Sequence, residues 1–257
     1  MNKYLKKLVK KILRKLGFEL RKLSNSNSTN SNLGLYAKEN LLDSFYNLLK
    51  TQNFKPSVIY DIGANKGTWT KECLKVFPDA HYHLFEPQEN LSKNIYNLLS
   101  DYSNFNLYSV GLGDENTSAY FTMHDRDDSC SFSYSKEEAL ERGFKQVELP
   151  IYRLDSFIEE NNLLTPDILK IDAEGLDLNV LEGAKGIIQN VEVIMVEVVV
   201  LNYRMENTVK NVVNYLDTIG FKFFDITDLN RPFPNKVLWL SEFVFVRKGG
   251  FLDKNYR

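Results

Sequence analysis

The stretch Val58–Gly67, VIYDIGANKG, decides the fold of this 257-residue chain. Its first half, Val58 to Ile62, is a short apolar run rich in β-branched residues, which is typical of a buried strand. A turn containing Gly63 and Gly67 follows, and residues 68–77 then have the apolar spacing of a helix. A strand that passes through a glycine turn into a helix is the first unit of an α/β sheet.

The same alternation continues toward the C-terminus. Further strands are predicted over 80–85, 105–112, 168–171, 191–198, 222–226 and 238–246, and helices over 87–99, 176–188 and 208–219. Short links between such elements predict a doubly wound, mostly parallel sheet of about seven strands with helices on both faces. The segments 119–123 and 146–152 are expected to form an antiparallel excursion from it.

The last two predicted strands differ from the others. Residues 227–237 join them, contain Pro232 and Pro234, and show no helical periodicity. We therefore expect these two strands to pair antiparallel at the edge of the sheet. In a sheet of this kind ligands bind at the carboxyl ends of the strands, so functional side chains are expected just after each strand.

The N-terminal segment is set apart by its charge. Residues 1–23 contain nine Lys or Arg side chains and one acid, and their apolar residues recur at helical spacing, which predicts a basic amphipathic helix. Residues 24–32 are all Ser, Asn or Thr and predict a flexible linker. Residues 33–257 then form the folded domain.

The basic helix has two interpretations. It can lie at an anionic membrane surface, where each lysine contributes about 1 kcal/mol, or it can pack on its own domain or on a second subunit. The overall charge of −2 argues against general nucleic-acid binding, and the two cysteines, Cys73 and Cys130, fit a reducing compartment. The expected location is cytoplasmic, with possible peripheral attachment to the membrane.

The first strand end carries an acid and a glycine turn, Asp61-x-Gly63-x-x-x-Gly67. The dinucleotide pattern G-x-G-x-x-G is absent, and Asp61 would repel a pyrophosphate but suits an amine-bearing ligand. Candidate ligand-binding residues of this turn are Asp61, Gly63, Ala64, Asn65, Gly67 and Thr68. The alternative is that the two glycines serve only a tight turn.

The next two strand ends complete a possible nucleoside pocket. Glu86, before Pro87, is placed to accept hydrogen bonds from both hydroxyls of a ribose, although an acid at a helix start is also favoured by the helix dipole. Gly111 and Asp114 lie at the end of the third strand, where a turn and an acid could line an adenine edge. A hairpin turn without any ligand explains them equally well.

Acids also cluster after the fourth strand. Asp172 and Glu174 could hold a divalent cation, act as a general base or bind substrate hydroxyls, and Glu197 could join them. Each of them could instead cap a helix. His124, in a polar insertion, is the last candidate base, although a lone loop histidine is more often only solvated. A metal is optional, and Asp172, Glu174 and Glu197 are its candidate ligands.

The motifs YDIGANKG, FEPQ, VGLGDEN, YRLDSF and LKIDAEGLDLNVLEGA, in this order and spacing, resemble the FkbM-like methyltransferases, which are S-adenosylmethionine-dependent enzymes with a Rossmann-like sheet. The resemblance covers about residues 57–197. It implies methyl transfer from S-adenosylmethionine, usually to a hydroxyl oxygen of a sugar or other natural product. It also implies that Gly63 and its loop bind the amino-acid end of the cofactor, Glu86 the ribose, and Asp114 the adenine side.

The favoured hypothesis is therefore an O-methyltransferase acting on a sugar, glycan or glycolipid precursor. Two alternatives are a nicotinamide-dependent oxidoreductase on the same sheet and a non-catalytic scaffold recruited through the basic helix. The acceptor is not identified by the sequence, because insertions such as residues 123–145 would shape its pocket.

Overall fold

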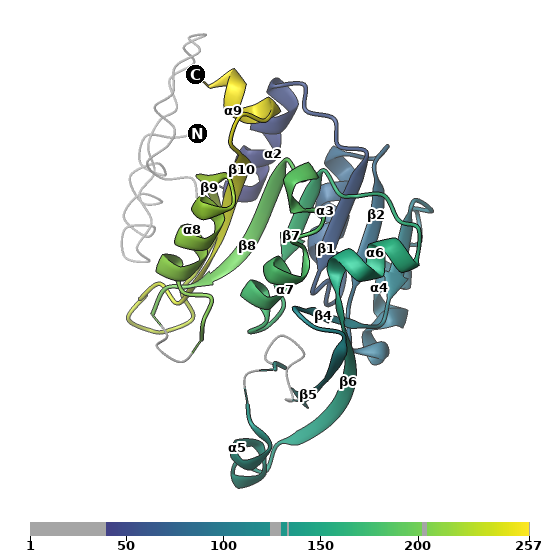
Figure 1. The fold of residues 1–257 in the computed structure, drawn as a ribbon, viewed down its shortest axis with the longest axis vertical. Helices are drawn as coiled ribbons and strands as arrows, with labels where there is room; N and C mark the ends of the chain where they lie inside the picture. Colours follow the sequence, from purple (N-terminus) through teal and green to yellow (C-terminus); the bar gives the residue numbers. More distant parts are fainter. Residues whose placement is uncertain (1–39, 124–129, 133, 202–204, 257) are drawn as a thin grey trace, which may run out of the picture. The chain divides into compact units, whose positions relative to one another are not determined.

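The described chain is organised around a seven-stranded sheet in the order β3-β2-β1-β7-β8-β10-β9 (Figure 1). The computed structural model describes residues 40–256 except 124–129, 133 and 202–204. The strands are β1 (Val58–Ile62), β2 (His81–Phe85), β3 (Phe105–Tyr108), β7 (Ile168–Ile171), β8 (Val193–Val199), β9 (Phe221–Asn230) and β10 (Leu240–Arg247). The predicted helix over 1–23 and linker over 24–32 lie outside the described residues.

The sheet is mostly parallel, as predicted. Strands β3, β2, β1, β7 and β8 all run in one direction, whereas β10 is antiparallel to both of its neighbours, β8 and β9. The predicted antiparallel pair at the sheet edge is thus confirmed, with the last strand of the chain inserted between β8 and β9. The parallel strands place their carboxyl ends along one edge of the sheet.

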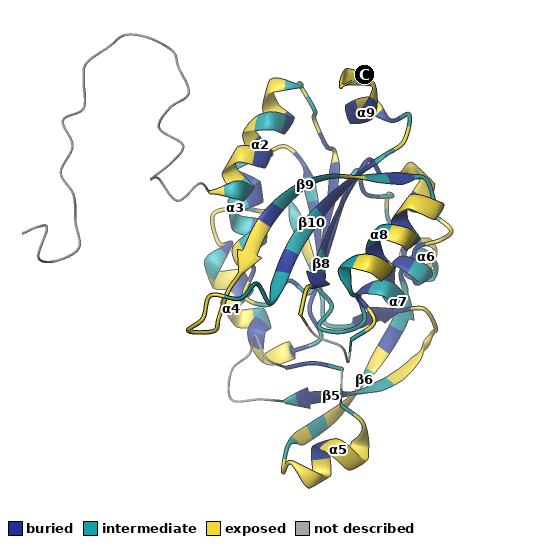
Figure 2. Cartoon of the chain, turned by 90° about the vertical axis from the view of Figure 1, so that its left-hand side faces the viewer, coloured by how far each residue is buried: buried dark blue, intermediate teal, exposed yellow. Residues whose placement is uncertain are grey.

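Helices cover both faces of the sheet, so the doubly wound prediction is confirmed. One face is covered by α2 (Leu41–Thr51), α3 (Thr68–Val76), α4 (Ser92–Leu98) and α9 (Phe251–Asn255), and the other by α6 (Leu154–Glu160), α7 (Asp177–Gly183) and α8 (Val209–Thr218). All residues of β1 and β7 are buried, and the helices turn their exposed sides outward (Figure 2). Apolar side chains on both faces of these central strands form the two halves of the core.

A second, three-stranded sheet holds β4 (Gly111–Gly113), β6 (Lys145–Arg153) and β5 (Thr117–Met123) in the order β4-β6-β5. Strands β5 and β6 pair antiparallel, which confirms the predicted excursion, and α5 (Lys136–Glu141) lies at its far end (Figure 1). The continuous strand predicted over 105–112 is wrong: β3 ends at Tyr108 and β4 pairs parallel with β6. The glycines of β4 allow this, since a β-carbon at either one would crowd Ile151.

Two helix predictions also change at their ends. Pro87 was predicted to start a helix, but a 3-10 turn over Glu89–Leu91 comes first and α4 begins only at Ser92. The turn arises because the Gln88 N–H donates to the Glu86 side chain and holds the chain extended at this point. Helix α7 ends at Gly183, although the helix was predicted to continue to Ile188. A β-carbon at position 183 would overlap the Gly113 carbonyl.

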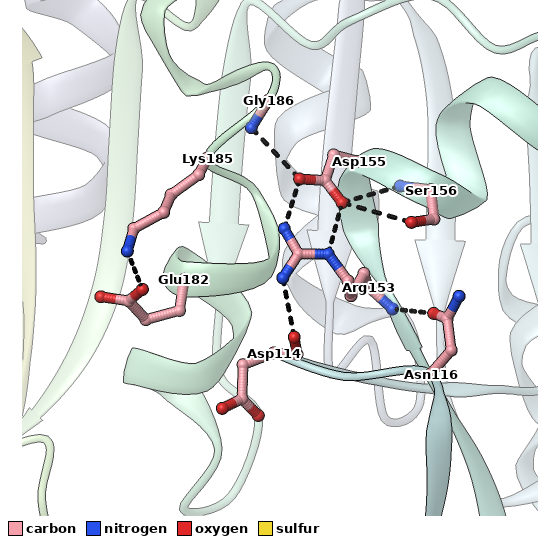
Figure 3. A network of polar contacts seen from close by, with 8 residues as sticks. All are labelled: Asp114, Asn116, Arg153, Asp155, Ser156, Glu182, Lys185 and Gly186. Carbon is pink, nitrogen blue, oxygen red and sulfur yellow. Dashed lines mark hydrogen bonds and ion pairs between the residues drawn. The ribbon is translucent and has the colours of Figure 1, made fainter.

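A polar network fixes the second sheet to the rest of the domain (Figure 3). The Arg153 guanidinium donates to both oxygens of Asp155, at 3.0 and 2.6 Å, and to the Asp114 carbonyl at 2.8 Å. Asp155 also accepts the Gly186 N–H beyond α7, at 3.2 Å. One bidentate ion pair thus joins the end of β6, the turn after β4 and the end of α7.

Candidate functional site

A cavity of about 300 Å³ lies at the carboxyl ends of β1, β2 and β7. Its lining includes nine of the residues predicted from the sequence: Gly63, Ala64, Asn65, Thr68, Glu86, Pro87, Gly111, Asp172 and Glu174. Asp61, Gly67, Asp114 and Glu197 do not line it, and His124 lies outside the described residues. The structure therefore brings residues from four separate segments together around one space, at the edge of the sheet where ligands of doubly wound folds bind.

A glycine is required at position 63 because two loops come into close contact there. Its φ is 73°, and a β-carbon at this position would overlap the main-chain oxygen of Asp172. The N–H groups of Gly63 and Ala64 both donate to the Phe85 carbonyl, at 2.9 and 3.1 Å. We expected Gly63 to let a ligand approach the backbone. The structure shows a further role, because Gly63 also lets the loop after β1 pack against the loop after β7.

Glu86 is the carboxylate best placed to face a ligand. Its side chain is 4% exposed, and its two oxygens accept the N–H groups of Asn65 at 2.8 Å and Gln88 at 2.9 Å. Burial raises its pKa, and these hydrogen bonds together with the charge of Lys170 oppose that rise. Each carboxylate oxygen can accept more than one hydrogen bond, so Glu86 retains the capacity to bind two neighbouring hydroxyls.

Asp61 occupies a different position from the one its sequence context suggested. Its carboxylate is fully buried, accepts the Thr70 hydroxyl at 2.5 Å and pairs with Lys170 at 3.2 Å. It thus stands behind the cavity wall, bound to the protein itself. Gly67 is similar in serving the fold, since it takes the left-handed conformation at the start of α3 with φ of 78°.

Lys170 is the functional candidate that our sequence analysis missed. It is 4% exposed, lines the cavity, and contacts Asp61, Asp172 and the Gly63 carbonyl. Burial lowers its pKa, but the carboxylates of Asp61 and Asp172 outweigh burial and raise it above the usual range. The signal was present in the sequence, since Lys170 is the one charged residue within the otherwise apolar strand Ile168–Ile171.

The acidic loop after β7 is held in an unusual conformation. Glu174 has φ of 50°, a region that residues other than glycine seldom adopt, and its carbonyl accepts the Phe132 N–H. The buried Asp177 carboxylate stabilises this shape by accepting the N–H groups of Ala173 and Gly175, at 3.0 and 3.3 Å. Asn207 donates to the same carboxylate at 3.0 Å.

Glu197 lies beside this loop without lining the cavity. Burial raises its pKa well above the usual value, and the negative charges of Asp172, Asp177 and Glu174 add to the rise. A carboxylate in such surroundings binds a proton more tightly than an exposed carboxylate does. Across residues 40–256, apart from the gaps noted above, no three His, Cys, Asp or Glu side chains gather as metal ligands would, and this includes Asp172, Glu174 and Glu197.

Asp114, the residue expected to lie on the adenine side, does not line the main cavity. The Asp114 side chain accepts the Asn179 amide at 3.0 Å and lines a separate, more open pocket with Glu182 and Tyr215. Val110, Gly111 and Leu112 line the main cavity instead, facing Phe121 and Phe132, whose rings are 4.7 Å apart. Because β4 turns into the second sheet, its later residues leave the cavity.

Comparison with known proteins places the chain in a family. Residues 61–223 match the model of the methyltransferase FkbM domain, so the chain belongs to the FkbM methyltransferase family. S-adenosylmethionine is the methyl donor that membership implies. The family assignment supports the methyltransferase hypothesis over the oxidoreductase and scaffold alternatives.

Two curated relatives are similar over part of the chain. Methyltransferase 1 of Beauveria bassiana is 26% identical over 165 residues, which are 57% of this chain and 65% of that protein. The 2-O-methyltransferase NoeI of Sinorhizobium fredii is 26% identical over 139 residues, which are 50% of this chain and 57% of that protein. The chain thus spans less than two thirds of the length of either relative.

A solved structure, methyltransferase FkbM from Methylobacillus flagellatus, superposes with a TM-score of 0.49 at 15% identity, covering 74% of this chain and 43% of that one. Another, the 1,6-didemethyltoxoflavin-N1-methyltransferase of Burkholderia thailandensis with bound S-adenosylhomocysteine, gives a TM-score of 0.44 at 11% identity, covering 84% of this chain and 82% of that one.

In the described segments, none of the helices has the length and apolar character needed to span a membrane.

Proposed function

We propose that this protein transfers a methyl group from S-adenosylmethionine to a hydroxyl oxygen of a sugar, glycan or glycolipid precursor. The observation that carries the proposal is the Glu86 carboxylate, which lines the cavity after β2 and is fixed by two main-chain N–H groups. A fixed carboxylate of this kind suits the two hydroxyls of a ribose. The apolar wall of Val110, Leu112 and Phe121 suits the adenine of the same nucleoside.

The donor's amino-acid end would lie between the loops after β1 and β7. Asn65, Thr68 and Asp172 line that part of the cavity, and Asp172 offers a carboxylate to the donor's ammonium group. No phosphate-binding pattern occurs in the loop after β1, which fits a donor that has a sulfonium and an ammonium and no phosphate. The protein's main task is then to align the acceptor oxygen with the methyl group.

A hydroxyl acceptor is supported by the carboxylates beside the cavity. A sugar hydroxyl must lose its proton during transfer, and Glu174 and Glu197 are our candidates to receive it, while His124 remains a candidate from sequence alone. The relative NoeI is named a 2-O-methyltransferase, which agrees with oxygen as the accepting atom. A divalent metal is not needed for this proposal.

Calorimetric titration with S-adenosylhomocysteine tests the donor site. We expect the wild-type protein to bind with a micromolar Kd, and Glu86→Ala to weaken binding about tenfold, which corresponds to about 1.4 kcal/mol. Glu89→Ala is the matched control, because Glu89 is an exposed acid three residues away. Circular dichroism checks that Glu86→Ala is folded, and Glu86→Gln, which preserves the side-chain shape, replaces it where it is not.

Absence of heat on titration with the wild-type protein would reject the proposed function. The acceptor class is tested separately, by incubating the protein with methyl-labelled S-adenosylmethionine and a set of neutral oligosaccharides. We expect label to enter a saccharide as a base-stable methyl ether. Label found on the protein itself and on no saccharide would reject the saccharide class and keep the methyltransferase.

A further inference from the structure

We propose that Lys170 is a positioning residue for methyl transfer, which joins the loops after β1 and β7 and holds the Asp172 carboxylate toward the bound donor. The inference rests on the proposed function and adds a residue to it. The Lys170 Nζ atom lies 3.2 Å from Asp61 Oδ1, 3.2 Å from the Gly63 carbonyl oxygen and 3.4 Å from Asp172 Oδ2. The three oxygens come from the buried strand β1, from the loop after β1 and from the loop after β7.

The three contacts match the chemistry of an ammonium group. A lysine ammonium has three N–H donors and no acceptor, and burying it costs several kcal/mol unless these donors are used. Lys170 is almost fully buried on β7, a strand whose other residues are apolar. Its position is therefore set by hydrogen bonds to the Gly63 carbonyl and to Asp172, and by the opposite charge of Asp61 at 3.2 Å.

One end of this arrangement is anchored in the core. Asp61 is fully buried and is held on its other oxygen by the Thr70 hydroxyl at 2.5 Å. The register of the sheet places Asp61 directly beside Lys170 on the neighbouring strand. The Asp61 carboxylate thus fixes the ammonium from behind the cavity wall.

The other end faces the cavity. The Asp172 side chain is 37% exposed and lines the cavity, so in the absence of Lys170 its carboxylate would be free to turn into solvent. Lys170 engages Oδ2, which leaves Oδ1 available to a ligand. At the same time it binds the Gly63 carbonyl, in the loop that packs against Asp172. Through one side chain, the core thereby sets the relative position of two loops that would enclose the donor's amino-acid end.

A purely structural ion pair would not need this geometry. Asp61 alone can balance the charge of Lys170, yet the ammonium is shared with a partly exposed carboxylate on the cavity side. Positioning of a group to within a fraction of an ångström strongly affects alignment of reactants. Removal of Lys170 should therefore lower the affinity for the ligand, because Asp172 is no longer held in place, in addition to any loss of stability.

A double-mutant cycle on donor-site binding tests this coupling. The affinity for S-adenosylhomocysteine is measured by calorimetry for the full-length wild-type protein, Lys170→Met, Asp172→Asn and the double variant. We expect each single variant to weaken binding about tenfold, and the double variant to bind no worse than either single variant. Lys75→Met, on the exposed side of α3, is the control and should bind as the wild type does.

Lys170→Met leaves two carboxylates without their partner, so a loss of folding must be separated from a loss of binding. The double variant Asp61→Asn, Lys170→Met removes both charges of the anchoring ion pair. It replaces Lys170→Met in the cycle where Lys170→Met does not fold. Additive effects of Lys170 and Asp172 on affinity would overturn the inference, as would wild-type affinity in Asp172→Asn. If either of these results is found and Glu86→Ala still weakens binding, the inference about Lys170 is rejected and the proposed function is kept. If the wild-type protein does not bind S-adenosylhomocysteine, both are rejected.

Discussion

The α-carbon of Gly63 lies against the main-chain oxygen of Asp172, so that a β-carbon at position 63 would overlap this oxygen. The two residues belong to loops separated by more than one hundred positions in the chain, and the Asp172 N–H also donates to the carbonyl of Ile62, at 3.0 Å. The close contact of these loops is therefore made by main-chain atoms of the protein itself.

This contact predicts a large effect for Gly63→Ala. The positive φ costs about 1 kcal/mol for alanine, and relief of the overlap with Asp172 should cost about 1–3 kcal/mol more. Gly67→Ala is the matched control: it shares the positive φ, but its β-carbon would make only ordinary contacts with Ile95 and Leu99. Urea unfolding of both variants measures the difference. Equal losses of stability would show that the overlap is relieved without cost.

Glu242 predicts an unusual pH dependence of stability. It lies on β10 opposite Glu197 and accepts the Thr227 hydroxyl. Burial raises its pKa to about 7, against an ordinary value of 4.5. The folded state therefore binds more protons than the unfolded state between these two values, so this residue lowers stability as pH rises from 4.5 through 7.

In Glu242→Gln this loss should disappear. The free energy of unfolding of the variant minus that of the wild type should become larger by about 2–3 kcal/mol as the pH is raised from 4.5 to 8. Unfolding by urea at several pH values measures it, and Glu89→Gln serves as an exposed control. A constant difference across this range would mean that Glu242 does not titrate in the folded protein as described.

His83 predicts the opposite slope. Burial, together with the neighbouring His81, lowers its pKa from 6.5 to about 4, and its ring packs 4.9 Å from that of Tyr60. The unfolded state then binds more protons between pH 4 and 6.5, so the neutral ring's contribution is complete above pH 6.5 and is lost as pH falls toward 4. We expect His83→Phe to unfold with a shallower pH dependence in this window. NMR titration of the imidazole checks the pKa directly.

The N-terminal segment supplies a prediction from sequence alone. Deletion of residues 1–23 should abolish sedimentation of the protein with anionic liposomes and leave its affinity for S-adenosylhomocysteine unchanged. Because lysines attract anionic headgroups through screened charges, raising the salt concentration should weaken sedimentation of the full-length protein. Unchanged sedimentation after deletion would reject the membrane role.

The fold was largely predictable because it depends on patterns that the chain repeats. Buried parallel strands such as β1 and β7 read as short apolar runs, and the glycine turn after Val58–Ile62 marks the first change of direction. The failures lie where tertiary contacts decide. Nothing local in residues 105–112 reveals that β4 will pair with β6 instead of continuing β3.

The candidate site was predictable in location and less so in detail. The ends of parallel strands must meet at one edge, which correctly gathers Gly63, Glu86 and Asp172 around one cavity. The sequence does not give the direction of a side chain, and so Asp61 was expected to face a ligand although it faces Thr70 and Lys170. Lys170 stands out in the sequence as a charge within an apolar strand, but the oxygens that it contacts are brought together only by the fold.

The short strand β4 also has an evolutionary consequence. It pairs with the end of β6 next to the main sheet, while α5 lies at the opposite end of the β5 and β6 hairpin (Figure 1). Residues inserted into or deleted from the tip of this hairpin would leave the strands around the cavity in register. Descendants of one ancestral gene can therefore diversify at the tip while keeping the strand ends of the main sheet that line the cavity.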